Sequence, residues 1–126
     1  MDTTWIAARP AVVAAAVAEP SSWRRWWPTL QLEVKELRGH KGVRWNVRSG
    51  RRARMTGTME LYLHPADDGV QVYYFLRLDG RTRPIPVRRR ARLAHAHRVR
   101  TKRAMWTLAN RLDPSRIERV RGQDCR

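Results

Sequence analysis

The sequence predicts an α+β fold in which a curved antiparallel sheet wraps around a long C-terminal helix, with two short helices after the first strand. Two patterns predict it: apolar side chains recur with helical spacing over residues 88–112, and they alternate with polar ones between residues 30 and 78. A chain of 126 residues supports one domain with a modest core. We therefore expect a single domain over residues 1–114 and a polar tail over residues 115–126.

The chain is expected to begin with a strand and a short helix. Residues 3–8 alternate in the manner of a strand. Pro10 then occupies a position that the first turn of a helix tolerates, and the alanine-rich residues 11–18 are strong helix formers. Pro20 is expected to end this first helix.

A second short helix is expected over residues 22–27, with Ser21 or Ser22 as its N-cap. Its spacing places three tryptophans on or near one face, whereas Arg24 and Arg25 point elsewhere. The tryptophans are Trp23, Trp26 and Trp27. Large indoles dominate packing wherever they lie, so the cluster is predicted to fill one end of a core, although a role as the lip of a pocket stays open.

The middle of the chain predicts an antiparallel sheet. Strands are expected over residues 30–35, 43–48, 54–63 and 70–78, because each alternates apolar and polar side chains. Residues 65–69 carry two aspartates and a glycine, residue types that favour a tight hairpin turn.

The outer face of this sheet should carry aromatic side chains. Thr58 and Glu60 indicate a hydrated face, yet Tyr62, Tyr73 and Phe75 share it. A covering loop explains such a patch more simply than a protein partner does, and both interpretations remain open.

The long helix has two different flanks. The apolar flank is expected to face the core, and it comprises Ala91, Ala94, Thr101, Met105, Leu108, Ala109 and Leu112, with Arg98 as its only charge. The opposite flank carries Arg89, Arg92, Ala96, Arg100 and Arg103, with Arg111 near its rim. Between Asp79 and Asp113 the sequence has eleven Lys and Arg residues and no carboxylate, so much of the net charge of +16 lies here.

A basic helix face of this density attracts phosphate on nucleic acid or lipid headgroups, and it equally attracts an acidic protein surface. The residues predicted to contact such a partner are Arg88, Arg89, Arg92, Arg100, Arg103 and Arg111. Aromatic residues are not interleaved with these arginines, which disfavours a stacking platform for single-stranded nucleic acid. Solvated arginines that only keep the protein soluble are the simpler interpretation.

No catalytic, metal-binding or cofactor-binding motif is apparent. His95 and His97 are two residues apart, so they face different sides of a helix and cannot share an ion. Asp67 and Asp68 precede Gly69 and are interpreted as turn residues. The lone Cys125 and the absence of a long apolar run predict a cytoplasmic protein, with a peripheral position at the inner membrane face left open.

Residues 18–30, AEPSSWRRWWPTL, together with this order of elements, resemble the START-like or Bet v 1-like superfamily (SRPBCC), and in particular small actinobacterial polyketide cyclase/dehydrase and lipid transport proteins. The resemblance implies a helix-grip fold, with a hydrophobic ligand between the sheet and the C-terminal helix. The implied cavity wall consists of Trp23, Trp27, Trp45, Met55, Met59, Leu61, Val72, Tyr74, Met105, Leu108 and Leu112.

The chain departs from the pattern of that superfamily in two ways: it has one strand pair fewer, and its last helix is dense in arginine. The first hypothesis is therefore a non-enzymatic domain that binds a lipid or polyketide-like molecule in a small cavity. The second is an accessory protein whose cavity is filled and whose arginines dock on the inner membrane face, an anionic membrane-protein complex or ribosomal RNA. A cyclase-type enzyme is the third, and no residue set supports it.

Overall fold

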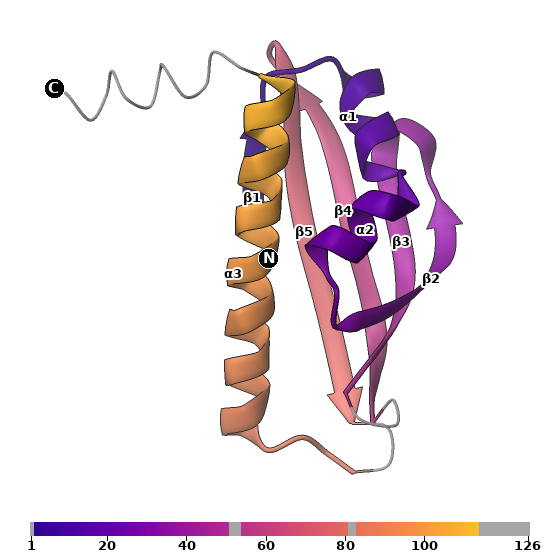
Figure 1. The fold of residues 1–126 in the computed structure, drawn as a ribbon, viewed down its shortest axis with the longest axis vertical. Helices are drawn as coiled ribbons and strands as arrows, with labels where there is room; N and C mark the ends of the chain where they lie inside the picture. Colours follow the sequence, from indigo (N-terminus) through magenta and orange to yellow (C-terminus); the bar gives the residue numbers. More distant parts are fainter. Residues whose placement is uncertain (1, 51–53, 81–82, 114–126) are drawn as a thin grey trace, which may run out of the picture.

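A computed structural model describes residues 2–50, 54–80 and 83–113 of the chain (Figure 1). The predicted polar tail, with Cys125, lies outside the described residues. In order, the elements are β1 (Asp2–Ile6), α1 (Pro10–Val17), α2 (Pro20–Trp26), β2 (Leu30–Leu37), the short 3₁₀ helix η1 (Gly39–Lys41), β3 (Gly42–Ser49), β4 (Met55–Ala66), β5 (Gly69–Gly80) and α3 (Val87–Leu112). The fold is α+β with a helix-grip-like layout, as the element order predicted.

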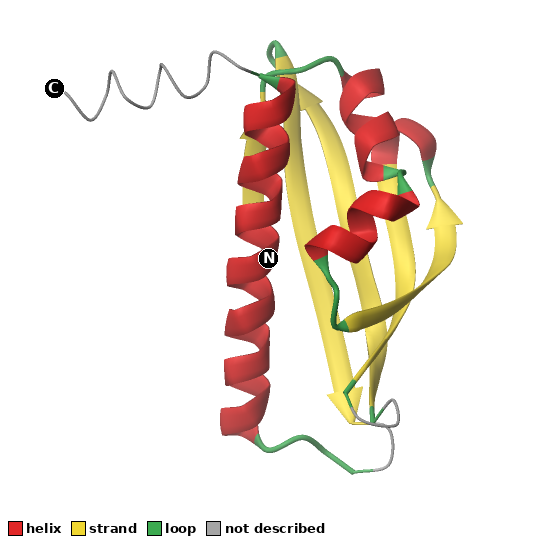
Figure 2. Ribbon diagram, in the orientation of Figure 1, coloured by secondary structure: helices red, strands yellow, loops and turns green. Residues whose placement is uncertain are grey.

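The sheet is open and has five strands in the order β1-β5-β4-β3-β2, with every neighbouring pair antiparallel. The first strand therefore adds to the edge formed by the last one. Figure 2 shows the three α-helices of the described chain on one face of this sheet, with α3 along the β1–β5 side and α1 and α2 over β3 and β4. The other face of the sheet carries none of these helices.

Strand register decides which side chains form the core. Trp45 pairs with Met59, and Val43 pairs with Leu61, so these residues face the helices together. Their neighbours in sequence face the opposite side, where Arg44 pairs with Glu60. The apolar alternation that the sequence predicted thus becomes the dry face of the sheet.

The β4–β5 hairpin confirms the predicted turn. Its connection is Asp67-Asp68, between Ala66 and Gly69, and Asp67 adopts a φ of 50°. Aspartate tolerates this left-handed region better than most residues, because its short polar side chain bonds locally.

The boundary between α1 and α2 differs from the sequence prediction. Pro20 does not only end the first helix; it begins the second, as the first helical residue after Glu19. The Glu19 side chain caps this helix by accepting a hydrogen bond from the Ser21 backbone N–H. The predicted serine N-cap is therefore wrong, because the fixed φ of proline suits the first helical position and places the cap at Glu19.

α3 runs unbroken over Val87–Leu112, within one residue of the prediction. Its buried residues, however, begin at His97, and Ala91 and Ala94 are exposed. The expectation that the apolar flank is buried along its whole length is wrong for the first turns. The reason is geometric. α3 contacts β1 and α2, and both lie beside its C-terminal half (Figure 1). The methyl side chains of Ala91 and Ala94, in its N-terminal half, are too short to reach the sheet.

Gly57, in the middle of β4, allows a close approach of β5. A Cβ added there would lie 1.7 Å from the Arg77 carbonyl oxygen, which is a backbone atom and cannot move alone. Replacing Gly57 with alanine should lower the free energy of unfolding by about 1–3 kcal/mol. Urea unfolding followed by tryptophan fluorescence measures this. The control is Thr58→Ala at the exposed neighbouring position, which should change the free energy of unfolding by about 0.5 kcal/mol or less. If the two variants changed this free energy equally, the close approach of Gly57 to the Arg77 carbonyl would not limit stability.

Candidate functional site: the core and the cationic helix face

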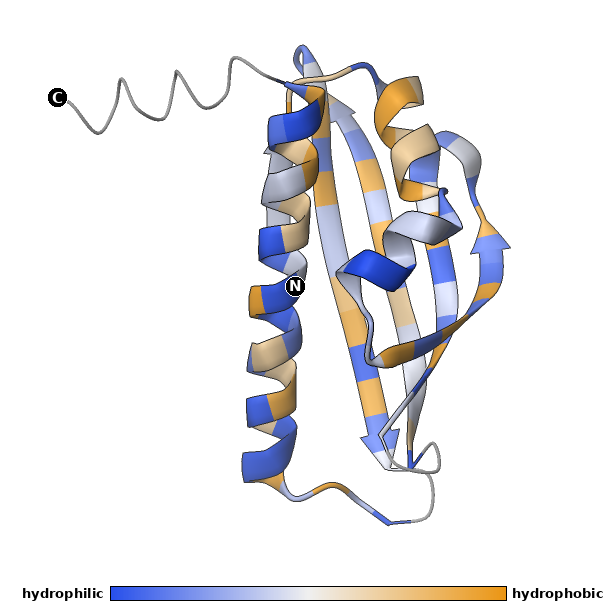
Figure 3. Ribbon diagram, in the orientation of Figure 1, coloured by the Kyte–Doolittle hydropathy of each residue, from blue (hydrophilic) through white to orange (hydrophobic). Residues whose placement is uncertain are grey.

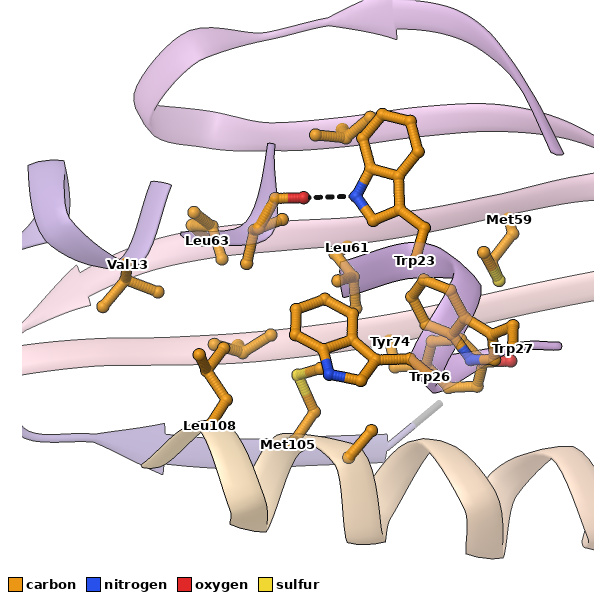
Figure 4. Close-up of a cluster of buried hydrophobic side chains, with 14 of the residues drawn as sticks. Val13, Trp23, Trp26, Trp27, Met59, Leu61, Leu63, Tyr74, Met105 and Leu108 are labelled. Atoms are coloured by element: carbon orange, nitrogen blue, oxygen red, sulfur yellow. Dashed lines mark hydrogen bonds between the residues drawn. The ribbon is translucent and has the colours of Figure 1, made fainter. Parts of the chain in front are cut away.

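Indole rings occupy the core between the helices and the sheet, and Figure 4 shows those of Trp23, Trp26 and Trp27. Trp45 of β3 meets Trp23 edge to face at a centroid distance of 5.2 Å, and it meets Trp27 at 5.4 Å. Trp27 also stacks on Tyr74 of β5, at 6.3 Å and an interplanar angle of 14°. These rings bury large apolar surfaces in favourable offset geometries, so indole rings occupy much of the space where the resemblance implied a ligand.

Two indole N–H groups of this cluster have protein acceptors. Trp23 Nε1 donates to the Val17 carbonyl oxygen at 2.6 Å, which fixes α2 against the end of α1 (Figure 4). Trp27 Nε1 donates to Thr101 Oγ1 at 2.8 Å. The second bond joins α2 to α3, so the two helices that were predicted separately are held at a defined spacing.

Two other buried polar atoms have no hydrogen-bond partner among the described residues: Trp45 Nε1 and the Tyr74 hydroxyl. The Tyr74 hydroxyl faces Thr101 without a hydrogen bond of good geometry. Burial raises the pKa of Tyr74 to about 12, so the phenol stays neutral. Unpaired buried polar groups cost free energy and are uncommon in native proteins.

The predicted wall residues are buried, except that Leu112 is half-buried at the end of α3. Most belong to a single core cluster, against which Leu112 packs. Met55 lies apart from that cluster, beside a hollow near Gly50 and Pro84. The structure therefore brings the predicted residues together chiefly as packed core.

A hollow of about 290 Å³ separates β5 from the first half of α3. Its apolar lining includes Leu76, Leu78 and Leu93, and His97 borders it from the helix. The His97 ring is buried, and burial, followed by the nearby charge of Arg100, lowers its pKa below the ordinary value. His95, two residues earlier, is exposed, so the expected divergence of the two rings is confirmed.

The six arginines predicted to contact an anion are all exposed. None of them forms an ion pair within the described chain, whereas Arg90 of the same helix lies 3.7 Å from Asp79. On the outer sheet face the situation is reversed, because Glu60 pairs with Arg38 at 2.8 Å and with Arg44 at 3.2 Å. Figure 3 shows hydrophilic residues recurring along the whole of α3.

A groove of about 660 Å³ lies between α2 and α3, and we call it the α2–α3 groove. Its cationic lining is Arg25, Arg100, Arg103 and Arg111, and its apolar lining includes Trp26, Val99 and Leu108. Sequence reasoning missed Arg25, which it placed away from the tryptophan face. No local signal could have found it, since the groove exists only once α2 and α3 are packed together.

The outer aromatic side chains form a second surface feature. Tyr62 lies beside Tyr73 and His64, at ring-centroid distances of 6.1 Å and 6.5 Å. Phe75 is 42% exposed. The described helices all lie on the other face of the sheet, so none of them covers this patch (Figure 2).

The described ranges also lack a metal-binding cluster and a membrane-spanning helix. No group of three or more histidine, cysteine or acidic side chains there is placed to hold a metal ion. No helix there combines the length and the apolar character needed to cross a membrane.

Comparison with known proteins does not assign a family: no protein-family model matches the chain, and no curated protein matches it significantly. The resemblance to START-like proteins therefore remains a prediction.

Stability should depend on pH through His97. Because its pKa is lower in the folded chain than the ordinary 6.5, the unfolded state binds the proton more readily. Stability is then complete above that value and falls as the pH decreases below it. Urea unfolding at a series of pH values should show a steeper dependence for the native chain than for His97→Gln. The exposed His40→Gln is the control and should retain the native slope; identical slopes for all three proteins would contradict the assignment.

Proposed function

We propose that this protein binds a polyanionic partner through the exposed arginines of α3. The observation that carries the proposal is that cations on the sheet form ion pairs, whereas six exposed arginines of α3 do not, within the described residues. Cations on the outer sheet face share Glu36 and Glu60, while six exposed arginines on α3 have no acidic partner among the described residues. Like charges held close together repel and destabilise the compact state unless an anion approaches them.

The backbone of α3, which carries these arginines, is held in place by contacts with other elements. A helix of 26 residues is about 39 Å long at a rise of 1.5 Å per residue. Its C-terminal half is fixed by the Trp27–Thr101 hydrogen bond and by Lys102 Nζ, which donates to the Thr3 carbonyl oxygen of β1. The backbone carrying the arginines is therefore ordered before a partner arrives, which reduces the entropy lost on binding.

Solubility alone would explain exposed arginines without any partner, and a charge-matched experiment separates the two interpretations. Changing Arg92, Arg100 and Arg103 to glutamine should weaken binding to anionic vesicles or to RNA and flatten its dependence on salt, because fewer counterions are displaced. The control changes Lys35, Lys41 and Arg48 to glutamine. These residues are exposed and belong to β2, η1 and β3 rather than to α3, and their replacement removes the same charge.

The α3 variant should lose at least about tenfold in affinity, since each cation near an anionic surface contributes about 1 kcal/mol. The control should lose distinctly less, and the melting temperature of both should stay close to the native value. Vesicle cosedimentation and RNA mobility shift measure the affinity. Equal losses in the two variants, or no binding by the native chain, would reject the proposal.

A second candidate is the binding of a small apolar ligand in a START-like, helix-grip arrangement, as the resemblance implies. The observation that favours it is the hollow between β5 and α3, whose lining includes Leu76, Leu78 and Leu93. This ligand would use the inside of the fold and leave the α3 arginines for docking at the inner membrane face.

For this second candidate, solvent extraction of the purified protein followed by mass spectrometry should release a stoichiometric apolar compound. Leu76→Trp, which narrows the hollow, should reduce the amount recovered, whereas Phe75→Trp on the outer face should not. Protein that yields no compound above the solvent background would argue against the candidate.

A further inference from the structure

The α2–α3 groove combines cations and apolar surface in one place. Arg100, Arg103 and Arg111 approach it from α3, and Arg25 approaches it from α2. Arg25 has only a weak contact of its own, to Ser22 Oγ at 3.5 Å, and the other three have no ion pair within the described chain. Four guanidinium groups around one hollow favour a phosphate, because the planar fork of donors matches its oxygens in bidentate contacts.

The apolar part of the groove distinguishes between sources of phosphate. Trp26 is only 8% exposed and packs edge to face on Trp27, at 5.6 Å and 83°. A ring held in this way offers an apolar edge but no free face on which a nucleic-acid base could stack. Val99 and Leu108 extend the apolar surface beside the arginines. A lipid headgroup with its glycerol backbone presents the same succession of anion and apolar chain.

We infer that the α2–α3 groove binds the phosphate headgroup and glycerol region of an anionic phospholipid. The inference rests on the proposed function, and it assigns the partner as a bilayer surface. The groove is preformed, since the Trp27–Thr101 hydrogen bond sets the distance between its two walls. Arginines further along α3, such as Arg92, then face neighbouring headgroups, where they contribute general electrostatic attraction.

The test compares two charge-matched pairs on the same two helices. The groove pair is Arg25→Gln with Arg111→Gln, and the control pair is Arg24→Gln with Arg88→Gln. All four side chains are exposed, and Arg24 and Arg88 lie outside the groove lining. Binding is measured by cosedimentation with phosphatidylcholine vesicles with and without phosphatidylglycerol.

Both pairs lose general attraction, and the groove pair should lose at least about tenfold more affinity, because it also loses the charge-assisted contacts to the headgroup. Ala96→Gln should also weaken vesicle binding at unchanged net charge, because it places a bulky side chain in the groove. Circular dichroism checks that each variant is folded.

A soluble probe separates the groove from the surface field. Dihexanoyl phosphatidylglycerol, kept below its micelle concentration, should shift the Trp26 indole N–H resonance of the native chain, and the groove pair should lose this shift. Dihexanoyl phosphatidylcholine and inorganic phosphate should both cause smaller shifts.

The outcomes separate the inference from the proposed function. Equal vesicle affinities for the two pairs would overturn the groove, while binding to phosphatidylglycerol vesicles would still support a polyanion. Native chain that binds RNA but not these vesicles would overturn the lipid assignment and leave the proposed function intact. No binding to either would overturn both.

Discussion

The hydrogen bond between Trp27 and Thr101 is the contact on which the arrangement of the described elements depends. It joins residues 74 positions apart, and it satisfies the one polar atom of an indole that is 1% exposed. Burying such a ring is favourable only if its N–H finds an acceptor, so this bond, the edge-to-face contact with Trp45 and the stacking on Tyr74 stabilise one another. The spacing of α2, α3 and the sheet follows from it, and so does the α2–α3 groove.

This constraint also divides the fold into two halves of different character. Around the C-terminal half of α3, aromatic rings pack against the sheet and leave little room for a ligand. Around its N-terminal half, Leu76 and Leu78 are only partly buried, and the helix stands further from the sheet. Because the closed half coincides with the space implied by the resemblance, the arginine surface of α3 becomes the stronger candidate for function.

The sequence predicted the positions of helices and strands well, but it predicted helix caps and the burial of side chains less well. α3 was placed within one residue, because a period sustained over 26 residues averages out local ambiguity. The second role of Pro20, as the first residue of α2, was missed because a proline can both stop one helix and start the next, and only the cap geometry shows which roles it has. Ala91 and Ala94 were expected in the core because periodicity tells which residues share a side of a helix, but not how far the neighbouring sheet extends.

The amino-acid pattern alone determined the α+β class, the alternation that gives the sheet one dry face, and the unbalanced charge of α3, since these depend on local spacing and composition. Tertiary structure decided what the sequence could not contain. It placed Arg25 of α2 in one groove with Arg100 and Arg103 of α3, left Trp45 Nε1 without a hydrogen-bond partner among the described residues, and packed indole rings against one another in the core. These outcomes depend on distances between segments far apart in the chain, and such distances are fixed only when the whole core packs.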